Sequence, residues 1–220
     1  MATNTLRSPH ILRLLDRLFV EDDSSHEAMQ QVTAQLDLPR LMTSKTQYRA
    51  LYGLLKQMPL PVSRETGYLL YMLARSTHAR TILEFGTSFG VSTIYLAAAL
   101  RDNGGGRIIT TEFEPEKAER ARANLIEAGL IDLVEIREGD ALQTLADGLP
   151  ESIDLVLLDG AKGLYGDILK LAEARLHPGS LVLADDAHHC PEYVHSMRSD
   201  TLKYLSIALA GNLEISMKLE

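Results

Sequence analysis

From Thr81 onward, short apolar runs of strand length alternate with longer amphipathic stretches. This alternation is typical of a parallel sheet covered by helices, because each connection between parallel strands must cross over the sheet. The runs are apolar nearly throughout, as expected when both faces of the sheet are buried. The pattern therefore predicts an open α/β fold. The predicted strands are TILEF, RIITTE, LVEIR, IDLVLLD and SLVLADD.

Helical patterns fill the stretches between these strands. Pro115 suits a first helical turn, because the N–H that proline lacks would have no partner there. Gly129 follows at the point where that helix is expected to end. The clearest predicted helices lie at residues 92–101, 115–128 and 164–176.

The two ends of the chain differ from this central pattern. After Asp186 the alternation stops, and the tail from Thr201 predicts two strands that turn at Gly211-Asn212 as an antiparallel hairpin. The first 60 residues predict a helical extension that serves as a lid or a dimer surface. Residues 61–220 form the core of the same single domain, since 220 residues suit one α/β domain. The helices predicted in the extension are 10–19, 25–36 and 47–57.

The composition limits the classes of binding partner and the cellular compartments that we expect. The chain has 22 Lys and Arg against 30 Asp and Glu, a formal net charge of -8, which disfavours binding to nucleic acid. Cys190 is the single cysteine, so no intrachain disulfide forms. The first residues do not have the pattern of a secretory signal, and no run reaches the roughly 20 apolar residues of a membrane span. These features predict a cytoplasmic protein that does not bind membranes.

A glycine-containing turn follows the first predicted strand. The strand ends in Glu84, the chain turns at Gly86, and a helix begins near Gly90. Glycine allows a ligand to approach the backbone closely, and a helix N-terminus offers free N–H groups to a carboxylate. The G-x-G-x-x-G spacing of dinucleotide sites is absent. The turn thus predicts a carboxylate-bearing nucleoside rather than NAD, although an NAD-dependent oxidoreductase is the alternative at the level of the sheet.

Two further acids suit a nucleoside site at the carboxyl ends of the strands, where open α/β sheets bind ligands. Glu112 ends the second strand, 26 positions after Gly86, and is predicted to bind ribose hydroxyls. Glu114 is the competing assignment, because strand ends are uncertain by a residue or two. Asp140 follows the third strand and is predicted to lie over the adenine, with a helix cap as its alternative role.

Three carboxylates follow the fourth and fifth strands: Asp159 in LLDGAK, and Asp185 and Asp186 in VLADDAHH. Neighbouring parallel strands bring these positions into one crevice. Crowded carboxylates raise one another's pKa unless a cation lies between them. An all-oxygen ligand set favours Mg²⁺, with Mn²⁺ or Ca²⁺ as alternatives, over zinc. We therefore predict a divalent metal site at these three residues.

Possible bases lie beside the carboxylates. Lys162 follows Asp159 by three residues, but a lysine with an ordinary pKa of about 10.4 is a poor base unless a nearby cation or burial lowers that pKa. The alternative is that Lys162 only pairs with a neighbouring acid on the surface. His188 and His189 are predicted to be loop residues, and they are the bases of a metal-independent alternative.

The segment ILEFGTSFGVST resembles the first motif of class I SAM-dependent methyltransferases, and specifically of the caffeoyl-CoA and catechol O-methyltransferase family. The similarity extends, with gaps, from about Pro59 to the C-terminus. PVSRETGYLL resembles the family's helix ahead of the first strand, where Val62 and Ser63 would approach the methionine end of the cofactor. Ser63 also suits a helix cap.

The resemblance implies a Rossmann-like, seven-stranded methyltransferase sheet with helices on both faces. It implies methyl transfer from S-adenosylmethionine (SAM) to a hydroxyl of a small, catechol-like acceptor, and a homodimer. Lys162 matches the family's catalytic lysine, and Asp159 belongs to the same catalytic pair. The family's metal site has an Asn where this chain has Asp186, which puts the metal in doubt. The expected cofactor-binding residues are Val62, Ser63, Glu84, Gly86, Thr87, Ser88, Gly90, Ser92, Glu112, Asp140, Ala141 and Asp159.

Two alternatives to this reaction remain open from the sequence. The first is a SAM-dependent methyltransferase without a metal, in which His188 or His189 is the base. The second is a module that binds SAM but transfers no methyl group.

Overall fold

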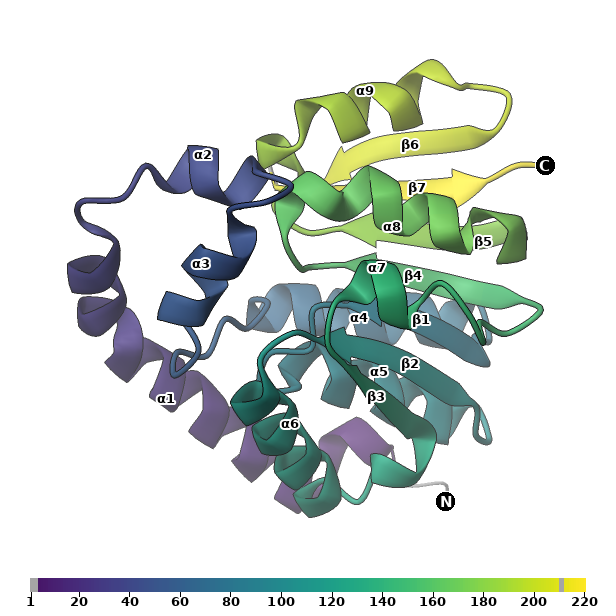
Figure 1. Ribbon diagram of the computed structural model, residues 1–220. Coiled ribbons are helices and arrows are strands. Elements are labelled where there is room, and N and C mark those ends of the chain that lie inside the picture. The colour runs from purple at the N-terminus through teal and green to yellow at the C-terminus, as the bar shows by residue number, and fades with distance from the viewer. Residues whose placement is uncertain (1–3, 210–211) are drawn as a thin grey trace.

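The computed structural model describes residues 4–209 and 212–220. Within these residues, a seven-stranded sheet has the order β3-β2-β1-β4-β5-β7-β6 (Figure 1). Neighbouring strands from β3 to β5 are parallel, whereas β7 is antiparallel to both β5 and β6. The predicted mixed sheet with a C-terminal hairpin is confirmed. The strands are β1 Thr81–Phe85, β2 Arg107–Glu112, β3 Val134–Glu138, β4 Ile153–Leu158, β5 Leu176–Ala184, β6 Tyr204–Leu209 and β7 Leu213–Lys218.

Helices cover both faces of the sheet. Helices α4, α5 and the first half of α1 share a core with one face, and α7, α8 and α9 pack on the other. The helices are α1 Pro9–Thr33, α2 Leu38–Thr43, α3 Tyr48–Leu54, α4 Arg64–Ser76, α5 Val91–Asp102, α6 Pro115–Glu127, α7 Ala141–Thr144, α8 Tyr165–Ala172 and α9 Pro191–Ser199.

Burial on both faces explains why the strands are apolar throughout. In β1, Ile82 lies in the core under α4 and α5, and Leu83 and Phe85 lie in the core under α8. Side chains of a strand alternate between the two faces, so both must be apolar when helices cover both.

Several predicted boundaries differ from the structure. The two helices predicted at 10–19 and 25–36 are one helix, α1, because the residues between them include no proline or glycine that would end it. Helix α2 was not predicted; Asp37 caps it by accepting a hydrogen bond from the Arg40 N–H. The helix predicted at 164–176 is shorter in the structure. Helix α8 ends at Ala172, and β5 already begins at Leu176. The predicted turn at Gly211 lies outside the described residues.

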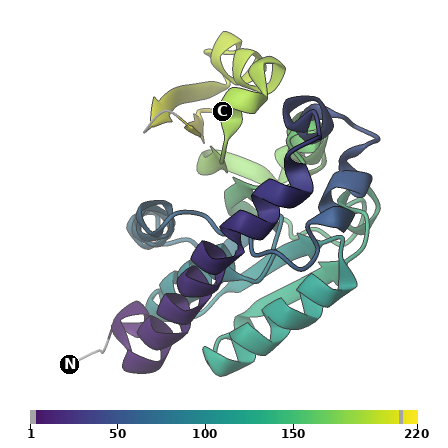
Figure 2. The ribbon, with the colours of Figure 1, turned by 90° about the vertical axis from the view of Figure 1, so that its left-hand side faces the viewer.

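Helices α2 and α3 lie at the carboxyl ends of the strands, whereas the first half of α1 packs against one face of the sheet (Figure 1). Figure 2 shows α1 running alongside α6, and ion pairs of Arg17 with Glu127 and of Arg120 with Glu21 join the two helices. Leu51 of α3 and Leu55, which follows that helix, form a small core of their own with residues of α1 and α2. The extension therefore packs partly against itself.

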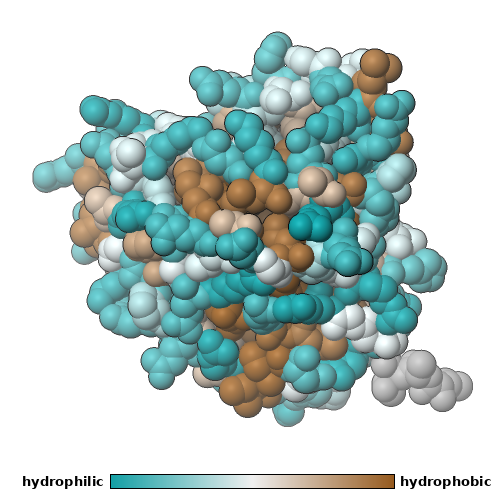
Figure 3. All heavy atoms as spheres, turned by 45° about the vertical axis from the view of Figure 1, so that its right-hand side comes forward, coloured by the Kyte–Doolittle hydropathy of each residue, from teal (hydrophilic) through white to brown (hydrophobic). Residues whose placement is uncertain are grey.

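The surface carries no membrane-spanning helix within the described ranges, since none is both long and apolar enough. Hydrophilic side chains dominate the face shown in Figure 3 and surround smaller hydrophobic patches. Apolar side chains of the edge hairpin are more than one-third exposed. They are Leu205, Ile207, Leu209 and Met217.

Asp154 of β4 joins the starts of β1 and β5. Its carboxylate accepts hydrogen bonds from the N–H groups of Arg80 (2.7 Å) and Thr81 (2.8 Å), and lies 2.9 Å from His177 Nε2. Burial raises the pKa of Asp154, but these hydrogen bonds together lower it below its ordinary value. The hydrogen bond with Asp154 raises the pKa of His177.

We expect this pair to make stability depend on pH. The lowered pKa of Asp154 contributes stability above about pH 3.9, which is lost in acid, and the raised pKa of His177 contributes stability below about pH 6.5, which is lost as pH rises through that pKa. Asp154→Asn should lower the free energy of unfolding by about 1–3 kcal/mol between those pH values, and by less outside them. Urea unfolding from pH 3 to pH 9 measures the difference, and a difference independent of pH would contradict the assignment.

Candidate active site

The turn after β1 lies against the end of β4. Gly86 has φ +104°, and a Cβ there would lie 2.5 Å from the carbonyl oxygen of Asp159. Gly90, at φ +84°, begins α5. The two glycines that the sequence singled out therefore allow a tight turn between β1 and α5.

A buried network of hydrogen bonds supports this turn. Glu84 is fully buried, and its carboxylate accepts hydrogen bonds of 2.6 Å each from the hydroxyls of Ser92, Thr93 and Thr110. Thr87 donates to the carbonyl of Thr111 at 2.9 Å. Glu84, Thr87 and Ser92 thus shape the turn, and their direct contact with a cofactor stays a prediction.

Glu112 is the better placed of the two candidate ribose acids. Its carboxylate accepts hydrogen bonds from the N–H of Ser88 (2.8 Å), which lies in the turn, and from the N–H of Glu114 (2.9 Å). Burial raises the pKa of Glu112, whereas these N–H groups and nearby Lys117 oppose the rise. Lys117 of α6 is itself buried, with Nζ 3.4 Å from Ser88 Oγ. Sequence reasoning missed Lys117, because a lysine within an amphipathic helix ordinarily indicates a solvated face.

A cavity of about 80 Å³ lies beside Glu112. Asp140, at its edge, caps α7 by accepting from the Leu142 N–H, so its alternative role as a helix cap is present. Asp140 also forms an ion pair of 2.5 Å with Arg49 of α3. The remaining lining includes the aromatic residues Tyr48, Tyr52, Phe85 and Phe113, together with Ala141 and Gly160.

Aromatic and basic residues of α3 lie beside this cavity. Tyr48 packs edge-to-face on Phe113 with ring centroids 6.4 Å apart, and the Arg49 guanidinium lies 5.4 Å from the Phe113 centroid. The Tyr52 hydroxyl lies 3.4 Å from the carbonyl oxygen of Gly160. These contacts join residues far apart in the chain, so no local pattern indicates them.

Val62 and Ser63 lie just ahead of α4. Ser63 caps this helix by accepting from the Thr66 N–H at 3.0 Å, and Val62 is buried. The preceding residues, Leu60 and Pro61, line a second small cavity with Gly86. Ser63 therefore has its alternative role as a cap, and the predicted contact of both residues with a cofactor stays a prediction.

Lys162 lies beside two of the three carboxylates that the sequence placed in one crevice, those of Asp159 and Asp186. Its Nζ is 3.2 Å from Asp159 Oδ1, 3.2 Å from the backbone carbonyl of Asp185 and 3.8 Å from Asp186 Oδ2. A fourth contact, of 2.8 Å, is with the hydroxyl of Tyr165. The lysine ammonium is thus a positive charge that the carboxylates of Asp159 and Asp186 share. Lys162 pairs with neighbouring acids, but it is buried and does not lie on the surface as that alternative expected.

The pKa values of this cluster follow from burial and charge. Burial raises the pKa of Asp159 to about 7, and the Lys162 ammonium opposes the rise. Burial lowers the pKa of Lys162, but the Tyr165 hydroxyl and the Asp159 carboxylate outweigh it and raise that pKa well above its ordinary value. Lys162 is therefore charged in this arrangement.

The carboxylates are of the right kind for a hard divalent cation, although they are not gathered as ligands here. Oδ1 of Asp185 is one of four buried side-chain atoms without a hydrogen-bond partner in the part of the chain that the structure describes. Asp186 has φ +51°, a conformation that Asp and Asn both tolerate, which accounts for either residue at this position. Of the described residues, only Asp22, Asp23 and His26 place three ligand atoms within 4.8 Å, and that group is on exposed α1.

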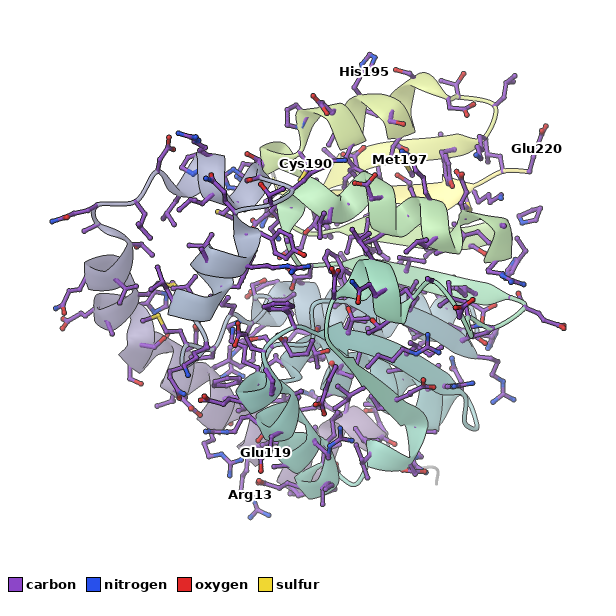
Figure 4. All side chains as sticks on the ribbon, in the orientation of Figure 1. Arg13, Glu119, Cys190, His195, Met197 and Glu220 are labelled. Carbon is purple, nitrogen blue, oxygen red and sulfur yellow. The ribbon has the colours of Figure 1, made fainter. Side chains whose placement is uncertain are left out.

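A groove of about 950 Å³ opens beside Lys162 and runs between α8 and α9. Cys190 lies at the start of α9, next to the beginning of α8, and its thiol is 3.3 Å from the Lys162 carbonyl (Figure 4). The rings of His188 and His189 lie 3.9 Å apart at the mouth of this groove. Burial and the neighbouring His188 lower the pKa of His189.

Comparison with known proteins shows the family. The methyltransferase domain family matches residues 83–187. Catechol O-methyltransferase of Mycobacterium tuberculosis is 32% identical over 178 residues, which cover 81% of this chain and 71% of that protein. The chain belongs to the catechol O-methyltransferase family of SAM-dependent O-methyltransferases. Catechol O-methyltransferase of Niastella koreensis is 38% identical over 130 residues, and this chain spans only 58% of its length.

Solved structures extend the likeness to the whole fold. A cofactor-bound protein from MTB has a TM-score of 0.67 and 26% identity, with 97% of this chain and 98% of that chain covered. The O-methyltransferase from Bacillus cereus in complex with SAH has a TM-score of 0.63 and 25% identity, with 87% and 97% covered. The predicted Rossmann-like methyltransferase sheet is confirmed.

Proposed function

We propose that this protein transfers a methyl group from SAM to a hydroxyl of a small, catechol-like aromatic acceptor. The observation that carries the proposal is the adjacency of two sites at one sheet edge. The anchored carboxylate of Glu112 lines the same cavity as Asp159, and Asp159 is 3.2 Å from the Nζ of the buried Lys162. The names of the relatives support a hydroxyl acceptor, and the SAH-bound neighbour supports the cofactor.

The cofactor would lie along the turn after β1. Glu112 would bind the ribose hydroxyls, Asp140 and Ala141 would face the adenine, and the N-terminus of α5 after Gly90 would receive the methionine carboxylate. The cavity of about 80 Å³ is well below the roughly 300 Å³ of typical ligand sites. We therefore propose that α3 moves outward when SAM binds, and that the part of residues 1–60 after the first half of α1 forms the lid.

The reaction is a direct displacement. The acceptor hydroxyl gives its proton to the neutral amine of Lys162, the new O–CH₃ bond forms as the S–CH₃ bond breaks, and SAH leaves. Because the carboxylates hold Lys162 in its charged form, the amine can act as a base only when another positive charge satisfies them.

A divalent cation held by Asp159, Asp185 and Asp186 would supply that charge and acidify the acceptor hydroxyl. The unpartnered oxygen of Asp185 and the all-oxygen donor set support Mg²⁺, with Mn²⁺ or Ca²⁺ as alternatives. Lys162 would keep its place beside Asp159.

Removal of the metal is the decisive test of this proposal. We expect EDTA to lower the rate of catechol methylation by roughly 10²-fold or more, since metal assistance supplies several kcal/mol, and we expect Mg²⁺ to restore it. Asp186→Asn, which introduces the family's residue, is the matched control and should keep the dependence on metal. Activity that survives EDTA would contradict the metal.

A specific observation favours one second candidate. His189 has a lowered pKa and lies at the mouth of the groove, so a neutral imidazole is available there as a base without a metal. Survival of activity in EDTA, together with its loss in His189→Ala, would select this candidate. A protein that binds SAH but methylates no catechol would instead be a binding module. The homodimer and the cytoplasmic location remain predictions.

A further inference from the structure

Tyr165 is the first residue of α8 and lies directly behind Lys162. Its side chain has no exposed surface. The Tyr165 hydroxyl donates a hydrogen bond of 2.7 Å to the backbone carbonyl of Asp185 and accepts one of 2.8 Å from Lys162 Nζ. It thus links the end of β5 to the candidate base.

The contacts of Lys162 leave little freedom for its ammonium. An ammonium has three N–H donors, and Tyr165, Asp159 and the Asp185 carbonyl take one each. The contact with Tyr165 is the shortest of them. Without it, Asp186 Oδ2, now 3.8 Å away, would compete for the free N–H. The hydroxyl therefore decides which way Nζ points.

The ring of Tyr165 is itself held by packing. It meets Phe85 edge-to-face with centroids 6.4 Å apart and Tyr193 edge-to-face at 5.7 Å. A phenylalanine at position 165 keeps both contacts and loses only the hydroxyl. Tyr165→Phe is therefore a clean probe of the hydrogen bonds.

We infer that Tyr165 is a positioning residue that holds Lys162 Nζ at the ends of β4 and β5 and affects methyl transfer only through Lys162. The inference rests on the proposed function with Lys162 as the base. Because misplacement of a reacting group by about 1 Å can cost on the order of 10²-fold in rate, loss of the hydroxyl should be visible in kcat.

A double-mutant cycle of Tyr165→Phe and Lys162→Met tests the inference, with catechol as acceptor. We expect Tyr165→Phe to lower kcat by roughly 10- to 100-fold, while the KM of catechol and the Kd of SAH change by less than about twofold. In the Lys162→Met background, Tyr165→Phe should have no further effect on kcat, since residues that act as one unit are not additive.

Tyr193→Phe is the matched control. The hydroxyl of Tyr193 is buried and has no hydrogen-bond partner among the described residues, and its ring packs on the same tyrosine. We expect its kcat to equal that of the wild type. A Tyr193→Phe variant as impaired as Tyr165→Phe, or an unimpaired Tyr165→Phe variant, would overturn the inference.

Kinetics of the single variants distinguish a wrong base from a wrong role for Tyr165. If Lys162→Met keeps wild-type kcat, the proposed base and this inference are both wrong. If Lys162→Met is inactive and Tyr165→Phe is not impaired, only the inference is wrong.

NMR gives a readout that needs no turnover and that a protein inactive on catechol also provides. The Hε shifts of Lys162, assigned by their loss in Lys162→Met, should change in Tyr165→Phe, because Nζ turns toward Asp186, and should stay nearly unchanged in Tyr193→Phe. Hε shifts that Tyr165→Phe leaves unchanged would overturn the inference.

Discussion

Lys162→Met is expected to lower kcat for catechol methylation by about 10²- to 10⁴-fold, the range that a positioned general base contributes. Methionine keeps much of the length and apolar character of the side chain and removes the amine. Because Lys162 does not line the cavity beside Glu112, the Kd of SAH should stay close to that of the wild type. Single-turnover kinetics and calorimetry with SAH measure the two effects separately.

Lys218→Met is the control for removing a lysine elsewhere. Lys218 ends β7 and donates to the carbonyl of Glu173, away from the carboxylate cluster. It should keep the wild-type kcat. A Lys162→Met variant that methylates catechol at the wild-type rate would refute the role of this lysine and shift the base to His188 or His189.

Gly86→Ala is expected to abolish SAH binding and to lower the free energy of unfolding by more than about 3 kcal/mol. Two costs add at this position. The backbone has φ +104°, which strains an L-residue, and the new Cβ would lie 2.5 Å from the backbone oxygen of Asp159. Backbone cannot swing aside as a flexible side chain can, so the turn and the end of β4 must separate.

Gly105→Ala separates the strain from the collision. Gly105 has φ +105°, nearly the same conformation, but no atom lies within 4 Å of the position that a Cβ would take there. We expect a cost of only about 1–2 kcal/mol at this glycine, with SAH binding unchanged. Urea unfolding and calorimetry of the two variants measure the difference. Equal costs would mean that the close approach of Gly86 to Asp159 is unimportant.

The sequence does not specify where the two histidines or the N-terminal helices lie. The run His188, His189 and Cys190 gives no orientation for its side chains, and only the structure places the histidine rings at the groove. The helical period of residues 1–60 predicts helices but not their partner. The ion pair between Arg49, in one of these helices, and Asp140 joins residues that are 91 positions apart in the chain.

The sequence by itself determined the sheet, the turn after β1 and the set of acids at the strand ends. Apolar period, glycine and proline positions, and strand–helix alternation are local properties, and local sterics and burial translate them directly into backbone structure. The family followed from the same motif.

Only the tertiary structure decided which contacts these acids make. It anchors Glu112, rather than Glu114, to the turn through the Ser88 N–H, and it puts the ammonium of Lys162 beside the carboxylates of Asp159 and Asp186. Such contacts depend on how separate strands and helices pack and on which charges are left without water. Charge and hydrogen bonding act through space, so spacing along the chain cannot specify them.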